Sequence, residues 1–319
     1  MPAFDFPFET LETYKGTNPC PSDFDAYWER ALGELSEIVS NPQLEPCHTT
    51  LFESVDCYHL RYRGVRNATI YTKYLKPKNL SAPAPTILIF HGYSASSADW
   101  IDLIKWTAEG FCVAAMDCRG QGGLSEDTGG VKGNTLRGHI IRGLDDHPDN
   151  LLFRHIYLDT VQLARTVASF SEVDETRLFA HGGSQGGALT LACAALEPKI
   201  VKAAAIFPFL SDYQRVWEMD LAKNAYEEIT HYLKRFDPRH ERIVKIWETL
   251  GYIDVHHLAK KIGAEVLMFT GLMDQICPPS SQFAAYNHIP GKKNIVTYPD
   301  FGHENLPGNQ EQVLKFFKS

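Results

Sequence analysis

A serine flanked by glycines is the feature of this chain that points most directly to chemistry. Positions 182–186 read Gly-Gly-Ser-Gln-Gly, between a strand-like run at 177–181 and an alanine- and leucine-rich run at 188–192. This order predicts a buried strand, a tight turn and a helix, because glycine alone fits a turn whose backbone lies against its neighbours. Ser184 would stand exposed at the bend, beside the N–H of Gln185 and the positive end of a helix. The pattern predicts acyl transfer, and the alternative is a glycine-rich turn without chemistry.

A serine nucleophile needs a base that takes its proton and a carboxylate that orients the base. Asp274 follows the run 264–270 and His303 follows the run 294–298, and both runs predict parallel strands. Loop residues at the carboxyl ends of parallel strands reach the same edge of a sheet. The sequence therefore predicts Ser184 as nucleophile, His303 as base and Asp274 as orienting carboxylate. For Asp274 the alternative is an ordinary turn residue.

The remaining histidines compete weakly for these roles. His181 is the main competitor as base, but it lies on the buried strand before the serine, where packing or one fixed hydrogen bond is expected. His256 and His257, with His231 and His240, suggest a metal site. No carboxylate or cysteine stands at a ligand spacing from them, so we expect solvated or capping roles, and neither a metal nor a cofactor.

An oxyanion hole needs a second N–H donor besides that of Gln185. The segment 91–93, His-Gly-Tyr, follows the strand-like run 86–90. Gly92 permits a sharp turn, so the Tyr93 N–H can point across the site, and each such donor is typically worth about 10²- to 10³-fold in rate. The alternative is an ordinary turn before a helix.

Bulky side chains are expected to make the acyl end of the site small. We expect Tyr93, Phe207, Pro208 and Phe209 to crowd that end, while the side that receives the alcohol stays open. A small pocket favours an acetyl group over longer acyl chains.

Arg119 lies in a glycine-rich segment, 117–123, that follows another strand-like run. The segment lacks the Gly-Lys-Ser/Thr ending of a phosphate-binding loop, so phosphate binding is disfavoured. We expect Arg119 to be a buried structural cation whose planar guanidinium ties together the loops around the site.

Composition and charge exclude several classes of protein. The chain has 319 residues, 44% of them hydrophobic, and a formal net charge of -8 without a basic stripe, which argues against a nucleic-acid partner. It has no apolar run long enough to span a membrane and begins without the basic and apolar segments of a secretion signal, so we expect a cytoplasmic protein. Its seven cysteines, an odd number without Cys-x-x-Cys spacing, are expected to be free thiols.

The predicted elements define a mostly parallel sheet with helices on both faces. A helix is expected at 23–39, capped by Ser22 and Asp25, followed by an antiparallel hairpin of strands at 55–62 and 68–75. Apolar strands then alternate with amphipathic helices, which predicts an α/β fold of the α/β-hydrolase type. The expected strands are 86–90, 111–116, 177–180, 201–206, 264–269 and 294–298, and a closing helix is expected at 310–317.

One helical stretch interrupts the alternation. Residues 207–260 contain no convincing strand, and helices are expected at 212–236 and 240–250. We expect this insertion to lie over the strand ends, where ligands bind in open α/β sheets. Because no repeat or linker divides the chain, we expect a single α/β-hydrolase domain over 1–319, with an N-terminal helical extension at 1–45.

The chain resembles carbohydrate esterase family 7, the acetyl xylan esterase and cephalosporin C deacetylase family, over nearly its whole length. The combination of Arg-Gly-Gln, Gly-x-Ser-Gln-Gly and His-Glu carries the resemblance, whereas each motif alone is weak. The matching segments are 23–28, 90–93, 119–123, 157–159, 182–189, 278–280, 283–287 and 301–304. One departure is His139, where the family usually has tryptophan.

The resemblance assigns roles to eight residues of the site. They are the catalytic Ser184, Asp274 and His303, the backbone N–H groups of Tyr93 and Gln185 as the oxyanion hole, and the supporting Arg119, Gln121 and Glu304. It implies hydrolysis of acetyl esters on short xylo-oligosaccharides and of the acetyl group of cephalosporin C, without a cofactor. It also implies a cytoplasmic homo-oligomer, a hexamer built as a dimer of trimers whose active sites face an interior cavity.

Two other functions remain open. The same triad serves a peptidase or a thioesterase, since it acts in any acyl transfer. A ligand-binding protein built on an inactive hydrolase scaffold is disfavoured, because all three triad residues are present.

Overall fold

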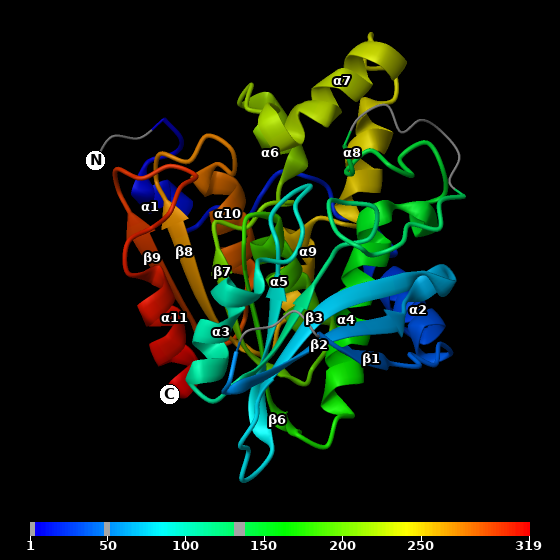
Figure 1. Ribbon diagram of the computed structural model, residues 1–319. Helices are drawn as coiled ribbons and strands as arrows, with labels where there is room; N and C mark the ends of the chain where they lie inside the picture. The colour runs from blue at the N-terminus through cyan, green and yellow to red at the C-terminus, as the bar shows by residue number, and fades with distance from the viewer. Residues whose placement is uncertain (1–3, 48–51, 131–137) are drawn as a thin grey trace.

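A nine-stranded twisted sheet runs through the computed structural model, which describes residues 4–47, 52–130 and 138–319 (Figure 1). The strands are β1 (Gln43–Pro46), β2 (Val55–Arg63), β3 (Thr69–Pro77), β4 (Ala84–Phe90), β5 (Cys112–Met116), β6 (Val173–Gly183), β7 (Ile200–Ile206), β8 (Glu265–Gly271) and β9 (Lys293–Tyr298). Their spatial order is β1-β2-β3-β5-β4-β6-β7-β8-β9. Neighbours from β5 to β9 are parallel, whereas β1, β2 and β3 pair antiparallel at one edge. The expected α/β-hydrolase fold class is confirmed.

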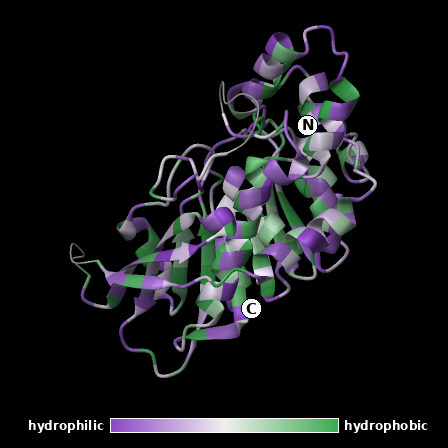
Figure 2. Cartoon of the chain, turned by 90° about the vertical axis from the view of Figure 1, so that its right-hand side faces the viewer, coloured by the Kyte–Doolittle hydropathy of each residue, from purple (hydrophilic) through white to green (hydrophobic). Residues whose placement is uncertain are grey.

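Helices cover both faces of this sheet and form two apolar layers with it. The helices are α1 (Phe8–Leu11), α2 (Phe24–Ser36), α3 (Trp100–Ala108), α4 (Leu152–Ala168), α5 (Gln185–Leu196), α6 (Tyr213–Glu218), α7 (Glu227–Phe236), α8 (Ile243–Gly251), α9 (Val255–Leu258), α10 (Pro279–His288) and α11 (Asn309–Lys318). One layer includes α3 and α11, and the other includes α2, α4, α5 and α10. Successive strand residues alternate between the layers, so Leu88 lies in one and Ile87 in the other. Figure 2 shows hydrophobic residues gathered in the central strands and on the helix faces turned toward them.

The burial of each strand follows its place in the sheet. All five residues of β5 are buried, because helices cover both faces of the parallel part. In β2, nearer the edge, buried residues are interspersed with partly exposed ones, as expected where one face meets solvent. Each fully buried side chain of the type of Phe153 or Leu158 stabilises the fold by roughly 1.5–3 kcal/mol.

The N-terminal region differs from its prediction. The helix expected at 23–39 is α2, which ends at Ser36, and among the described residues no side chain caps its start. The expected cap is therefore wrong, and Asp25 instead forms an ion pair with Lys261 at 2.7 Å. The short edge strand β1 is absent from the prediction because all four of its residues are exposed and show no apolar alternation.

In the sequence, helices α6, α7 and α8 come after β7 and before β8. In space they extend beyond the carboxyl ends of the parallel strands (Figure 1). The helix expected at 212–236 is divided in two, because the chain enters the left-handed region at Asp220 and Asn224. Of the N-terminal extension expected at 1–45, residues 1–3 lie outside the described residues.

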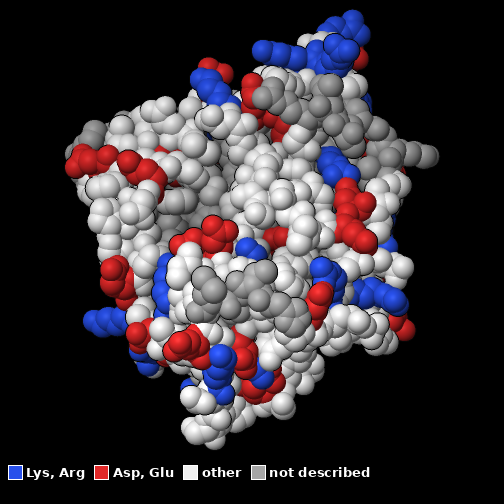
Figure 3. Space-filling view, viewed as in Figure 1, with Lys and Arg blue, Asp and Glu red and all other residues white. Residues whose placement is uncertain are grey.

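Charged side chains of both signs are interspersed on the molecular surface. On the face shown in Figure 3, acidic and basic groups alternate, and a group of basic side chains lies over α7, whose last turn contains Lys234 and Arg235. This distribution differs from the continuous basic stripe of a nucleic-acid-binding surface. In the part of the chain that the structure describes, no helix is long and apolar enough to cross a membrane.

Three buried histidines should make the folded protein less stable at acidic pH. Burial lowers the pKa of His155 to about 2 and the pKa values of His181 and His257 to about 4. Because an unfolded histidine has a pKa of about 6.5, the unfolded chain binds more protons than the folded chain between about pH 6.5 and pH 4. The free energy of unfolding therefore falls as the pH falls through this range, by on the order of 2–3 kcal/mol for each histidine.

Urea denaturation at about pH 7.5 and about pH 4.5 measures this effect. The His181→Gln variant should lose its share of the pH dependence. The wild type and this variant contain the same carboxyl groups, so the carboxyl contribution cancels in the comparison. An unchanged pH dependence in His181→Gln would contradict the prediction.

Candidate active site

A tight turn joins the end of β6 to the start of α5 and contains Ser184. This half-buried serine has φ 58° and ψ -120°, a conformation that is strained for any residue other than glycine. A Cβ on Gly186 would lie 2.0 Å from the carbonyl oxygen of Phe90, and a Cβ on Gly182 would lie 2.6 Å from the same oxygen. Both positions require glycine because the turn lies against the end of β4.

Three side chains that are distant in the sequence meet at this turn. His303 Nε2 lies 3.0 Å from Ser184 Oγ, and His303 Nδ1 lies 2.8 Å from Asp274 Oδ2. With the proton on Nδ1 and donated to Asp274, Nε2 accepts the hydrogen bond from the serine hydroxyl. This is the arrangement that a general base requires.

The loop after β8 fixes the orientation of Asp274. The carboxylate is fully buried, and its Oδ1 accepts hydrogen bonds from the N–H groups of Ile276 and Cys277, both at 2.8 Å. Because two backbone donors hold Oδ1, Oδ2 stays directed at His303. The aspartate is thus oriented before any substrate arrives.

The loop after β9 carries His303 and lies against the loop after β8. A Cβ on Gly271 would lie 2.3 Å from the carbonyl oxygen of Phe301, so only glycine allows the two loops to approach this closely. Glu304 Oε1 accepts a hydrogen bond from the N–H of Gly302 at 3.1 Å. The supporting role expected of Glu304 would consist of holding the turn that presents the imidazole.

Gln121 joins the two segments that contain the expected oxyanion donors. Its Oε1 accepts a hydrogen bond from the N–H of Ser94 at 2.9 Å, and its Nε2 donates to Gln185 Oε1 at 2.9 Å. Ser94 follows Tyr93 directly, so one side-chain amide connects the Tyr93 loop to the start of α5. The N–H groups of Tyr93 and Gln185 therefore belong to segments that are held together.

Arg119, in the loop after β5, forms a buried ion pair with Asp159 of α4. Its Nε and one terminal nitrogen donate to the two carboxylate oxygens of Asp159 at 2.6 and 2.7 Å, and the same terminal nitrogen donates to the carbonyl oxygen of Val65 at 3.1 Å. Both charged side chains are 1% exposed. The guanidinium ties the loop after β5 to α4 and to the turn after β2, which is the kind of contact expected for it.

The bulky residues expected at the acyl end follow β7. The Phe207 ring packs against the His303 ring with centroids 4.3 Å apart, and the Phe209 ring packs against Tyr93 at 5.5 Å. A Cβ on Gly187 would lie 3.1 Å from Pro208 Cα, so Pro208 covers the first turn of α5. The three residues therefore pack around the triad and the Tyr93 loop.

Three other histidines have partners of their own. His181 Nδ1 lies 3.0 Å from the carbonyl oxygen of Ala204, a contact of the fixed kind expected for it. His231 pairs with Glu227 at 3.2 Å, and His240 packs against the Trp217 ring.

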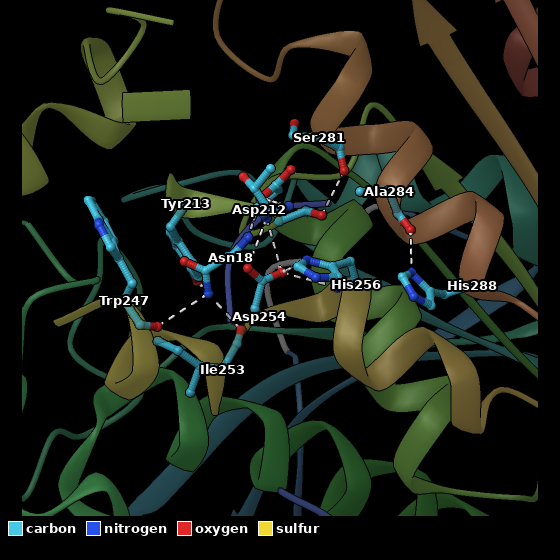
Figure 4. Close-up of polar contacts among 12 residues, drawn as sticks. Asn18, Asp212, Tyr213, Trp247, Ile253, Asp254, His256, Ser281, Ala284 and His288 are labelled. Carbon is cyan, nitrogen blue, oxygen red and sulfur yellow. Dashed lines mark hydrogen bonds and ion pairs between the residues drawn. The ribbon is translucent and has the colours of Figure 1, made fainter. Parts of the chain in front are cut away.

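Solvated or capping roles were expected for His256 and His257, and the solvated role is wrong because both side chains are buried. His256 Nδ1 lies 2.7 Å from Asp254 Oδ1, and the Asp254 carboxylate also accepts from the N–H of Asp212 (Figure 4). Burial opposes a charge on His256, but the Asp254 carboxylate outweighs it and raises the pKa of His256. Asp212 in turn accepts from the N–H of Asn18 at 2.9 Å. This network joins the N-terminal segment to α6 and α9.

Cys277 is a residue near the triad that sequence reasoning missed. Among the described residues, Asp274, Cys277 and His303 form the group whose potential metal-ligand atoms lie within 4.8 Å of one another. Asp274 and His303 already bond to each other, and burial raises the pKa of Cys277 well above its usual range, which keeps the sulfur a neutral thiol. Metal binding needs the thiolate, so the group fits acid–base chemistry better than metal binding. The available signal was the position of Cys277, three residues after Asp274.

A strained serine turn lies at the carboxyl end of a strand of a mostly parallel sheet, and an aspartate and a histidine follow later strands. This arrangement defines the class of α/β hydrolases. The chain belongs to the acetyl xylan esterase (AXE1) family, which matches residues 1–319. The family resemblance inferred from the motifs is therefore confirmed.

Known proteins resemble this chain over most of its length. Acetyl xylan esterase 1 from Thermoanaerobacterium sp. JW/SL YS485 is 55% identical, with a TM-score of 0.97 and 98% of each chain covered. The acetyl xylan esterase from Paenibacillus sp. R4 is 34% identical, with a TM-score of 0.94, covering 98% of this chain and 99% of that one. The acetyl esterase Axe7A of Xylanibacter ruminicola is 28% identical over 284 residues, which are 88% of this chain but 62% of that protein. The chain therefore spans about three fifths of the length of this relative.

Proposed function

We propose that this chain is a serine esterase that removes acetyl groups from small acetylated carbohydrates, xylo-oligosaccharides among them, and from cephalosporin C. The contact of His303 with both Ser184 and Asp274 carries this proposal, because it supplies a nucleophile, a base and an orienting carboxylate. Membership of the acetyl xylan esterase family supports the acetyl ester as the bond that is cleaved.

The proposed reaction has two steps. Ser184 Oγ attacks the acetyl carbonyl carbon while its proton passes to His303 Nε2, and Asp274 stabilises the imidazolium that forms. The N–H groups of Tyr93 and Gln185 bind the negative charge on the carbonyl oxygen. The imidazolium then gives its proton to the departing alcohol. In the second step water attacks the acetyl-enzyme while His303 takes its proton, and His303 returns that proton to Ser184 Oγ as the acyl bond breaks and acetate leaves.

Rates on a panel of substrates test the proposed substrate class. Acetylated xylobiose and cephalosporin C should be deacetylated with higher kcat/KM than peptide anilides or acyl-CoA thioesters, because the pocket is expected to fit an acetyl group. Faster cleavage of the anilides would favour a peptidase, and faster cleavage of acyl-CoA would favour a thioesterase. A protein that cleaves none of them and resists a serine-directed phosphonate would be a ligand-binding scaffold.

The length of the acyl chain should change the rate strongly. The Phe207 ring packs against His303 and the Phe209 ring packs against Tyr93, so the six additional methylene groups of an octanoyl ester should not fit without strain. We expect kcat/KM for p-nitrophenyl acetate to exceed that for the octanoate by about 100-fold, with propionate and butyrate between them. Comparable values for acetate and octanoate would contradict a small acyl pocket.

We also propose that the chain forms one α/β-hydrolase domain, acts in the cytoplasm and assembles into a hexamer, a dimer of trimers. The shared sheet from β1 to β9 supports the first of these, and the family resemblance supports the other two. A mass measurement in solution, by light scattering at several concentrations, tests the hexamer, and a monomeric mass would contradict it.

A further inference from the structure

A buried carboxyl group of the insertion contacts two segments next to the proposed oxyanion hole. Glu228, on α7, is 3% exposed. Its Oε1 accepts hydrogen bonds from the hydroxyl of Tyr93 and from the N–H of His139 at 3.0 Å, and its Oε2 accepts from the N–H of Ile141 at 2.9 Å. Donors from the loop after β4 and from the segment 138–141 thus converge on one carboxyl group of a third element.

This convergence depends on a close approach at Gly138. The glycine has φ +75°, and a Cβ there would lie 2.4 Å from Glu228 Cδ and 2.6 Å from the Tyr93 hydroxyl oxygen. Any side chain at this position would push the carboxyl group and the tyrosine apart. Burial raises the pKa of Glu228, and the hydrogen bonds from Tyr93 and the backbone oppose that rise, so the carboxyl group depends on these donors rather than on water.

Tyr93 is held along its whole length. On the backbone side, the N–H of the next residue, Ser94, donates to Gln121 at 2.9 Å. The Tyr93 ring contacts the rings of Phe209 and His139, with centroids 5.5 and 5.0 Å away. Glu228 fixes the hydroxyl at the far end. A change at Glu228 would therefore be transmitted through the ring to the Tyr93 backbone.

We propose that Glu228 is a positioning residue that acts through Tyr93 to keep the Tyr93 N–H directed at the developing oxyanion. The inference rests on the proposed function, because the Tyr93 N–H is a proposed donor. Its consequence is that the insertion contributes to the chemical step itself, in addition to covering the strand ends.

Two variants test the hydrogen bond between Tyr93 and Glu228, and each changes one of the two partners. Tyr93→Phe removes the hydroxyl but leaves the ring and the backbone, and Glu228→Gln places an amide NH₂ group among N–H and O–H donors. Each should lower kcat on p-nitrophenyl acetate by about 10- to 100-fold, less than the loss of a whole oxyanion donor, with KM within about threefold. Affinity for a boronic acid, which forms a tetrahedral adduct with the serine, should fall in parallel with kcat. The double variant should lose no more than the larger single loss, because both changes remove the same contact.

Glu227→Gln is the matched control, because Glu227 is the preceding residue of α7 and its side chain is 37% exposed and pairs with His231. It should keep wild-type kcat. Wild-type kcat in a folded Tyr93→Phe variant would overturn the proposal. If Glu228→Gln does not fold, the kcat of Tyr93→Phe is by itself the test. An active Ser184→Ala variant would instead refute the proposed function, so the two failures are distinguishable.

Discussion

Replacing Ser184 with alanine is expected to lower kcat on acetyl esters by about 10⁶-fold, the loss recorded for the equivalent change in a serine hydrolase. The hydroxyl oxygen is the proposed nucleophile, and without it His303 Nε2 has no serine proton to accept. Alanine tolerates φ 58° no worse than serine does, so the turn should keep its shape. Steady-state kinetics on p-nitrophenyl acetate, with the thermal midpoint measured alongside, checks both statements.

Ser171→Ala is the control for this substitution, since Ser171 is exposed and lies on the loop before β6. It should keep wild-type kcat and should still react with a serine-directed phosphonate at one position. Ser184→Ala should not react. Residual activity near the wild-type level in Ser184→Ala would mean that another residue is the nucleophile.

Replacing Asp274 with asparagine should lower kcat by about 10⁴-fold, as in the corresponding change in the chymotrypsin-type triad. An asparagine oxygen that accepts from the N–H groups of Ile276 and Cys277 leaves its NH₂ group facing His303 Nδ1. His303 must then carry its proton on Nε2, where it cannot accept the proton of Ser184. The fold should survive because the substitution preserves the size of the side chain.

The control is Asp300→Asn, at an exposed aspartate of the loop that also carries His303. Its kcat should match the wild type. The kcat of Asp274→Asn should rise at high pH, where hydroxide substitutes for the missing base, whereas KM should change little. A kcat within tenfold of the wild type would show that Asp274 does not orient the base.

The local sequence pattern was sufficient to predict the strands and turns that position this site. Glycines at 182 and 186 are required because of backbone contacts with the adjacent strand, and such a requirement is visible in the residue types alone. The apolar runs that became β4, β5, β7 and β8 are nearly continuous because helices bury both faces of the sheet there. Once those strands are parallel, the loops containing Asp274 and His303 must reach the edge where Ser184 lies.

Other features were invisible in the sequence because they depend on contacts between distant residues. Tyr93 and Glu228 are separated by 135 positions, and nothing in the helical pattern of α7 distinguishes Glu228 from a solvent-facing acid. Asp25 has the spacing of a helix cap but pairs with Lys261, and His256 resembles a surface histidine but pairs with Asp254 in the interior. Local spacing predicts what a side chain can do, whereas tertiary packing decides which partner it finds.

From the order of its residues alone, the chain can be assigned an α/β-hydrolase fold, a strained serine turn and the two loops that follow later strands. Those assignments need only short-range sterics and the alternation of strands and helices. Tertiary folding alone produces the 3.0 Å distance from His303 Nε2 to Ser184 Oγ. The same is true of the burial of Glu228. Tertiary structure decides them because a buried polar group takes whichever donor or acceptor the packed fold brings to it.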